Sequence, residues 1–513
     1  MKYQNPVIPG YHPDPSICRV GEDFYIVNST FEYFPGVPIH HSKNLANWEL
    51  IGHCLTRADQ LPLEKCRPSG GIYAPTIRYH DGWFFMTTTN VSCGGNFIIH
   101  SRRPDGEWSD PVWVDQGGID PSLLFDEDGK VYFTSTGNDE KGRSCILICE
   151  LDPFTGLKYT ESRILSYGCG GRYPEGPHLY KIRGKYYLML AEGGTEYGHM
   201  ETIQRSDSPY GPFEPCPHNP ILSHKEDMRG EIYCTGHADM TEDANGNWWM
   251  VCLAVRPCGG KNHRLMLHHL GRETYLAPVV WDENGWPVVG EHGLIDLEME
   301  GELPGEPEKV SLDFADDFTE PEFPLQYNFL RNPKMECYIR EPEKKRLLLS
   351  GTEITLNEQD TPTWVGVRQM GFVTETTVFV TPLGRREGMR AGLTAFYNND
   401  YHYDLCLKRE SGRWNLCLAK HVHDIFAVTA KTELSGEGGI WLKIQSDREI
   451  YRFLYSTDGV KWQFLGTGLV VGLCTESTRT MTFTGTYLGM FAENGDAEFA
   501  DFSIRVKEEE DFF

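Results

Sequence analysis

The sequence has 513 residues, enough for two to four domains, since a domain averages about 150 residues. Asp and Glu total 74 against 48 Lys and Arg, so the formal net charge is −26, and such a surface repels nucleic-acid phosphates and anionic lipid. The longest apolar run, Trp248 to Val255, has 8 residues, whereas a membrane-spanning helix needs about 20. Composition therefore argues against nucleic-acid and membrane partners.

The N-terminal segment, MKYQNPVIPGYHPDPS, contains one Lys and no apolar stretch, so it predicts neither a signal peptide nor a transit peptide. The 15 cysteines are an odd number, and no two of them have the CxxC spacing. This usage is typical of free, buried thiols in a reducing compartment, and it predicts a cytoplasmic protein. The alternative is a secreted protein whose sequence is given as the mature chain.

A short phrase recurs five times in the first half of the chain, at intervals of 47 to 62 residues. It consists of a glycine, one or two further residues, and two bulky apolar residues that open a strand. A blade of four short strands with its turns occupies about this length, so the repeat predicts a five-bladed β-propeller. The alternative is that these residues only mark hairpin turns in another kind of antiparallel β protein. The glycines are Gly21, Gly82, Gly129, Gly184 and Gly246.

A second repeat precedes each of these glycines and is clearest in Asp14-Pro15-Ser16-Ile17 and Asp120-Pro121-Ser122-Leu123. We expect it to open the innermost strand of each blade, because inner strands surround the propeller axis. The residues at these points should then converge on one central cavity. They are Asp14, Tyr73, Asp120, Glu175 and His237.

The segment EMEGELPGEPEKV after Leu297 is rich in acidic residues, Gly and Pro, and it has the composition of a linker. We therefore expect a first domain over residues 1–305 and a second over 306–513. Beyond the linker, residues 403–407 and 414–418 alternate with a period of two around the turn Glu410-Ser411-Gly412. This pattern predicts hairpins with one buried face, and hence an all-β second domain built as a β-sandwich.

Three carboxylates stand on the predicted inner strands, each beside proline: Asp14, Asp120 and Glu175. Proline restricts its neighbours and interrupts ladder hydrogen bonding, which would hold these side chains in fixed directions. Turn capping is the alternative for any single Asp-Pro pair. Paired carboxylates around an aromatic cavity are the groups that glycoside hydrolysis needs, one as general acid and one as base or nucleophile. A third acid nearby would raise the pKa of the proton donor.

The motifs NPVIPGYHPDPSI, GGIYAP, GGIDPSLLFD, RYPEGPHLY, TGHADM and GRETYLAPV occur in this order over the first 290 residues. Together they resemble glycoside hydrolase family 43, in its branch of two-domain β-xylosidases and α-L-arabinofuranosidases. The second domain resembles, more loosely, the jelly-roll, concanavalin-like β-sandwich of that branch. The resemblance also implies that this sandwich sends a loop toward the mouth of the propeller cavity.

The resemblance implies a role for individual residues. Asp14 would be the general base of an inverting mechanism, Glu175 the general acid, and Asp120 the acid that tunes the pKa of Glu175. Three further residues are implied to bind the terminal sugar: Phe31 as a pocket wall, Arg272 through hydroxyl groups, and Thr195, which would also support the acid.

The sequence leaves the roles of Tyr73 and His237 open. Members of this branch commonly have Trp where this chain has Tyr73. The smaller tyrosine ring offers less stacking area and adds a hydroxyl group, so the preference for xylose or arabinofuranose stays open. His237 is the candidate metal ligand, since family members often hold Ca²⁺ near the propeller axis. A satisfied histidine beside Asp14 is the alternative. No cofactor is expected to be required.

The sequence thus predicts an exo-acting, inverting hydrolase that releases terminal xylose from short xylo-oligosaccharides. The alternatives are an α-L-arabinofuranosidase or bifunctional enzyme, a retaining β-fructosidase, whose usual Glu-Cys motif is missing, and a carbohydrate-binding protein without catalysis. The expected partners are short pentose-containing oligosaccharides and further copies of the chain in a homo-oligomer.

Overall fold

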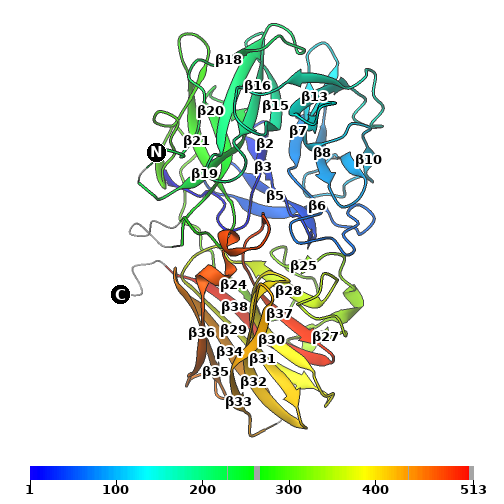
Figure 1. The fold of residues 1–513 in the computed structure, drawn as a ribbon, viewed down its shortest axis with the longest axis vertical. Helices are drawn as coiled ribbons and strands as arrows, with labels where there is room; N and C mark the ends of the chain where they lie inside the picture. The colour runs from blue at the N-terminus through cyan, green and yellow to red at the C-terminus, as the bar shows by residue number, and fades with distance from the viewer. Residues whose placement is uncertain (228, 259–265, 437, 508–513) are drawn as a thin grey trace.

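The computed structural model describes residues 1–227, 229–258, 266–436 and 438–507. It contains two β domains that are stacked along the long axis of the molecule (Figure 1). Within these ranges no helix combines the length and apolar character that crossing a membrane requires. The short helices are of the 3₁₀ type: η1 (Met335–Cys337), η2 (Pro342–Lys344), η3 (Val470–Leu473) and η4 (Thr475–Ser477).

The first domain is a five-bladed propeller, as the repeats predicted, and each blade is an antiparallel sheet of four strands. Every repeated glycine lies in the turn between the first two strands of a blade, with φ between 65° and 87°. Only glycine adopts this backbone region without strain. The blades are, from first to last strand, β2 (Ser16–Val20), β3 (Asp23–Val27), β5 (Gly36–Ser42) and β6 (Glu49–Leu55); β7 (Thr76–His80), β8 (Trp83–Asn90), β9 (Gly95–Ser101) and β10 (Val112–Trp113); β11 (Ile119–Phe125), β12 (Val131–Asn138), β13 (Ser144–Glu150) and β14 (Arg163–Ser166); β15 (Glu175–Ile182), β16 (Lys185–Glu192), β17 (Met200–Ser206) and β18 (Glu214–Pro215); β19 (Tyr233–Glu242), β20 (Trp248–Val255), β21 (Glu273–Trp281) and β22 (Pro287–Val289).

The N-terminal segment ties the last blade to the first. β1 (Lys2–Gln4) pairs with β23 (Glu298–Glu300), and Ile8 forms a bridge with Thr274 of the fifth blade. The chain then enters β2 of the first blade directly, so Asp14 and the fifth blade are held against each other by backbone hydrogen bonds.

The second domain is a β-sandwich of two sheets, one with eight strands of this domain and one with seven, to which a strand of the propeller domain adds an eighth. The predicted hairpin is present, with Cys406 opposite Cys417, but β31 and β32 are buried on both faces rather than one. Their second face is covered because it packs into an aromatic cluster that includes Trp364 and Phe396. The sandwich strands are β24 (Phe314–Asp316), β25 (Asn328–Leu330), β26 (Tyr338–Glu341), β27 (Arg346–Ser350), β28 (Thr363–Arg368), β29 (Thr374–Leu383), β30 (Arg390–Asn398), β31 (Tyr401–Glu410), β32 (Arg413–Val422), β33 (Ile425–Glu433), β34 (Ile440–Ser446), β35 (Ile450–Ser456), β36 (Gln463–Leu469), β37 (Tyr487–Glu493) and β38 (Asp496–Val506).

The two domains share a sheet. β4 (Tyr33–Phe34), which lies between strands of the first blade, pairs with β25 at the edge of one sandwich sheet. The segment 301–313 forms no strand, and the expected boundary at residue 305 falls inside it. Because β4 begins two residues after Phe31, the sandwich is anchored next to a predicted site residue.

Candidate active site

Two of the three predicted carboxylates occupy the same unusual backbone position in different blades. Asp14 and Asp120 have φ angles of 51° and 53°, and each is followed by proline. The register between β11 and β12 shifts between Ile119 and Ser122, so Asp120 lies in a β-bulge. A bulge re-aims a side chain relative to the regular alternation, and Asp enters left-handed backbone more readily than most residues. Backbone geometry therefore directs both carboxylates.

The fourth blade uses glycine at the equivalent position. Gly176 has a φ of 54°, and a Cβ added to it would lie 3.2 Å from the ring of His237. The register with β16 shifts between Glu175 and His178. Glycine thus permits a close approach of the fourth blade to His237 of the fifth. Glu175, one residue earlier, is brought beside the other two carboxylates, since both Asp14 and Asp120 interact electrostatically with it.

Asp14 is buried and held as a carboxylate. The Nη1 and Nη2 groups of Arg272 donate to its Oδ1 and Oδ2 at 2.9 and 3.4 Å, and Ser29 Oγ donates to Oδ2 at 2.5 Å. Burial by itself raises the pKa of Asp14, but the charge of Arg272 and the Ser29 hydrogen bond help to outweigh it, and the pKa lies below its usual value. Asp14 is therefore ionised at neutral pH.

The pKa values of Glu175 and Asp120 are raised, in contrast to that of Asp14. Burial, and then the charge of Asp14, raise the pKa of Glu175 to about 7, although Arg272 opposes the shift. Burial, and then the charges of Glu175 and Asp14, raise the pKa of Asp120 well above its usual range, against the backbone N–H of Gly176, which donates to Oδ2 at 3.2 Å. Since the two acids titrate as a pair, the pair retains a proton near neutral pH.

Arg272 connects the carboxylate of Asp14 to the predicted sugar-binding residues. Besides Asp14, its Nη1 donates to Thr195 Oγ1 at 3.1 Å and its Nη2 to the carbonyl of Phe483 at 3.3 Å. Its Nε is buried and has no partner in the described part of the chain. Thr195 thus contacts Arg272, whereas its expected support of Glu175 stays a prediction.

Three aromatic rings from separate segments meet beside this arginine. The ring of Phe31 stacks on Phe483 at 5.6 Å between centroids and meets Tyr73 edge-on at 5.1 Å. The guanidinium carbon of Arg272 lies 5.7 Å from the Phe31 ring and 5.4 Å from the Phe483 ring. Phe31, Tyr73 and Arg272, three of the predicted site residues, therefore lie together.

Phe483 was not identified as a site residue from the sequence. It belongs to the sandwich, between η4 and β37, and its backbone N–H donates to Ser69 Oγ of the propeller at 2.9 Å. The expected sandwich loop thus reaches the site. Residues 480–486 have no motif or periodic pattern that distinguishes Phe483 from its neighbours, so only the tertiary contact reveals it.

His237 lies next to Asp14, with Nδ1 3.9 Å from Oδ1. Burial lowers the pKa of His237, so the imidazole is neutral at neutral pH. Asp14 is already engaged by Arg272 and Ser29, and among the described residues no group of three metal-ligand side chains includes His237. Because Ca²⁺ takes six to eight oxygen ligands, these side chains alone do not fit a Ca²⁺ site. An ion held by His237 and waters stays a prediction.

An ion pair between buried Asp239 and partly buried Arg78 was also missed. Arg78 donates to both carboxylate oxygens of Asp239, at 2.7 and 3.2 Å. Ser16 and Tyr180 donate to the same carboxylate, each at 2.6 Å. These residues come from the first, second, fourth and fifth blades, so the network fixes the inner strands of the blades that carry Asp14 and Glu175. TGHADM contains Asp239, but the partner Arg78 has no motif.

Both domains match known protein families. Residues 3–287 match the family described as glycosyl hydrolases family 43, and residues 315–505 match the β-xylosidase C-terminal concanavalin A-like domain. The chain is 42% identical over 502 residues to the non-reducing end α-L-arabinofuranosidase of Bacteroides ovatus, covering 96% of this chain and 92% of the relative. It is 31% identical to a β-xylosidase of Bacillus subtilis, covering 99% and 100%.

Solved structures superpose on nearly the whole chain. A protein of the Bacteroides ovatus xyloglucan locus superposes with a TM-score of 0.92 and 40% identity, covering 99% of this chain and 100% of that one. The xylan β-1,4-xylosidase of Bacillus halodurans superposes with a TM-score of 0.92 and 31% identity, covering 98% and 100%.

Proposed function

The chain belongs to glycosyl hydrolase family 43, and we propose that it is an exo-acting, inverting enzyme that releases terminal xylose from short xylo-oligosaccharides. The observation that carries this proposal is the opposite protonation of two acids in one site. Asp14 is held ionised by Arg272, while the pKa of Glu175 is raised to about 7. A base and an acid present together at neutral pH are what single-step hydrolysis with inversion requires.

In the proposed mechanism Glu175 donates its proton to the glycosidic oxygen as the bond to the anomeric carbon breaks. Asp14 removes a proton from a water, whose oxygen bonds to the opposite face of that carbon. The products are the free sugar with inverted configuration and the shortened alcohol. Asp14 then gives its proton to solvent and Glu175 regains one. The mechanism predicts carboxyl groups roughly 6.5 to 9.5 Å apart, to admit the water. No step requires a metal ion.

Asp120 acts through Glu175 in this proposal. The two acids titrate as a pair, so ionisation of either one disfavours ionisation of the other, and the proton that the pair retains is the one available to the donor. Arg272 has a double task, because it keeps Asp14 ionised and, beside Thr195, is placed to bind hydroxyl groups of the terminal sugar. Phe31, Tyr73 and Phe483 supply the apolar wall against which one sugar ring packs.

Arabinofuranosidase activity is the second candidate, and two observations favour it. Tyr73 replaces the tryptophan expected in a β-xylosidase, and the relative with 42% identity carries the name α-L-arabinofuranosidase. Both sugars are pentoses with similar hydroxyl groups, so one pocket could accept both. We therefore include a bifunctional enzyme in the proposal.

The test compares kcat/KM on 4-nitrophenyl β-D-xyloside and 4-nitrophenyl α-L-arabinofuranoside. Faster turnover of the xyloside supports a β-xylosidase. Faster turnover of the arabinofuranoside would make α-L-arabinofuranosidase the main activity. Proton NMR of the first product anomer distinguishes inversion from retention. Hydrolysis that Asp14→Asn abolishes would exclude a binding protein without catalysis, whereas activity that survives Asp14→Asn would contradict the assigned base.

We also propose a cytoplasmic location with small, imported substrates. None of the 15 cysteines, all of which are in the described part of the chain, forms a disulfide. This state supports a reducing compartment. Fractionation of the source cells with an antibody against the protein tests the location, and size-exclusion chromatography with light scattering tests the expected homo-oligomer.

A further inference from the structure

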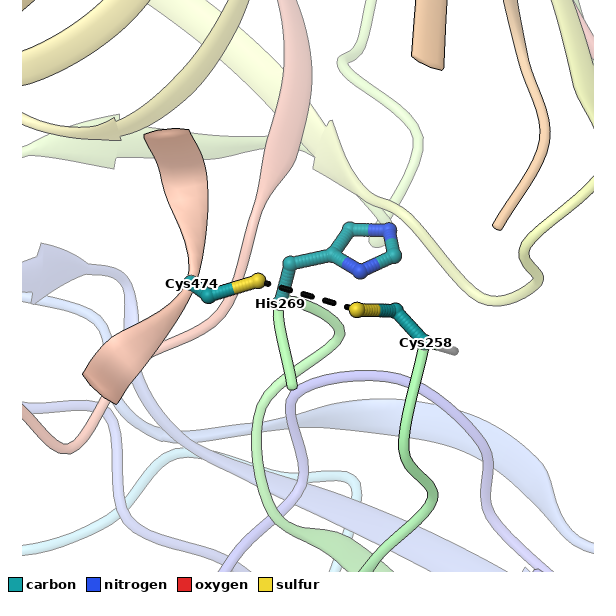
Figure 2. A group of neighbouring side chains, drawn as sticks. All are labelled: Cys258, His269 and Cys474. Atoms are coloured by element: carbon teal, nitrogen blue, oxygen red, sulfur yellow. Dashed lines mark hydrogen bonds between the residues drawn. The ribbon is translucent and has the colours of Figure 1, made fainter. Parts of the chain in front are cut away.

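Three potential metal ligands meet at the domain junction, outside the proposed active site. Cys258 lies after β20 of the fifth blade, His269 lies three residues before Arg272, and Cys474 lies between η3 and η4 of the sandwich. Figure 2 shows the two thiols facing each other with the imidazole beside them. All three side chains are buried: Cys258 is 5% exposed, and His269 and Cys474 are fully covered.

The spacing of the three side chains matches a tetrahedral metal ion. The two sulfur atoms are 3.8 Å apart, and the three ligand atoms lie within 4.8 Å of one another. Two thiolates bound to zinc at about 2.3 Å and at the tetrahedral angle lie about 3.8 Å apart. A bond between the sulfurs would instead require about 2.05 Å.

The imidazole of His269 provides an independent observation. Neither of its ring nitrogens has a hydrogen-bond partner among the described residues, although the side chain is fully buried. A buried polar group without a partner is unfavourable and uncommon in folded proteins. A metal ion between the imidazole and the two thiols would satisfy one of these nitrogens.

Another buried thiol pair in this chain lacks the third ligand. Cys406 and Cys417 are cross-strand partners of β31 and β32, and both are buried. Among the described residues they belong to no group of three metal-ligand side chains. This pair therefore serves as a matched control for packing alone.

We propose that Cys258, His269 and Cys474 form a binding site for a thiophilic divalent cation, Zn²⁺. Two thiolates and one imidazole form a donor set that binds zinc in preference to magnesium or calcium. On binding, each thiol loses its proton to solvent, and a water fills the fourth position of the ion. Glu476 is not the fourth ligand, because its carboxylate is engaged by the backbone N–H and ring of His268.

The site would join the two domains next to the active centre without entering the reaction. Thr475 donates its backbone N–H to the carbonyl of His268 at 3.0 Å, and Thr486 donates to that of His269 at 2.8 Å. The ion would bridge the same two segments through side chains. We expect bound metal to stabilise the junction that holds Phe483 against Arg272.

The test uses the full-length protein, dialysed against a chelator and titrated with Co²⁺ as a spectroscopic probe. We expect one Co²⁺ per chain, a near-ultraviolet thiolate-to-cobalt absorption, the visible absorption of tetrahedral cobalt, and displacement by Zn²⁺. Cys258→Ser and Cys474→Ser should each lose about half of the thiolate absorption and more than about tenfold in affinity. Cys417→Ala should leave both unchanged.

A second measurement needs no variant and so does not depend on whether the substitutions fold. In the wild-type protein, Zn²⁺ should slow alkylation of Cys258 and Cys474, read by peptide mass spectrometry, while leaving exposed Cys93 and buried Cys406 unaffected. Absence of the thiolate absorption, equal protection of Cys406, or a Cys258–Cys474 disulfide in freshly isolated protein would overturn the proposal.

Discussion

Replacing Glu175 by Gln removes the proton that the proposed mechanism delivers to the leaving group. Burial and the charge of Asp14 raise the pKa of Glu175 from 4.5 to about 7. At pH 7 about half of such groups are protonated, against roughly one in three hundred for an unshifted Glu. The loss of this donor should slow xylobiose hydrolysis by about 10² to 10⁴. That factor corresponds to roughly 3 to 5.5 kcal/mol of activation free energy.

The assay compares two substrates that differ in their need for an acid. A 4-nitrophenyl glycoside has a good leaving group, so Glu175→Gln should slow it much less than xylobiose. The pH profile gives a second signature. Glu175 must be protonated to act, so wild-type kcat/KM on xylobiose should fall as pH rises through about 7. This basic limb should vanish in the variant.

Glu196→Gln is the matched control, because Glu196 is an exposed carboxylate in the same loop as Thr195. It should leave both substrates and the pH profile unchanged. Equal loss on both substrates in Glu175→Gln, or a basic limb that persists near pH 7, would refute the assignment of Glu175 as the acid.

Three further predictions follow from the described contacts. Asp120→Asn removes the acid whose ionisation competes with that of Glu175, so the basic limb of the kcat/KM profile should move to lower pH; an unmoved limb would contradict this tuning role. Phe483→Ala removes stacking worth about 0.5 to 1.5 kcal/mol, so KM for the xyloside should rise roughly two- to twelvefold. An unchanged KM would show that the sandwich ring does not contribute to the pocket. Asp239→Asn leaves the partly buried Arg78 charge without its ion-pair partner, so urea denaturation should show a loss of about 3 to 5 kcal/mol in the free energy of unfolding. A loss below about 1 kcal/mol would contradict the structural importance of this pair.

The propeller could be predicted from the sequence because its information is local. Each blade repeats a glycine that must adopt left-handed backbone in the same turn, so the repeat counts the blades. The Asp-Pro pairs at Asp14 and Asp120 are likewise local signals for inner-strand starts. The sandwich hairpin was also predictable from its period of two, although burial of its second face was not.

The sequence by itself determined the fold class and the number of blades, and it singled out three carboxylates on the inner strands. Only the tertiary structure decided which groups surround these carboxylates. Arg272 lies 258 residues from Asp14 and 211 from Phe483, and no local pattern couples such distant positions. The same contacts decide protonation, because pKa values depend on burial and on neighbouring charges that only the folded chain brings together. For the same reason the buried group of Cys258, His269 and Cys474 becomes visible only when both domains are assembled.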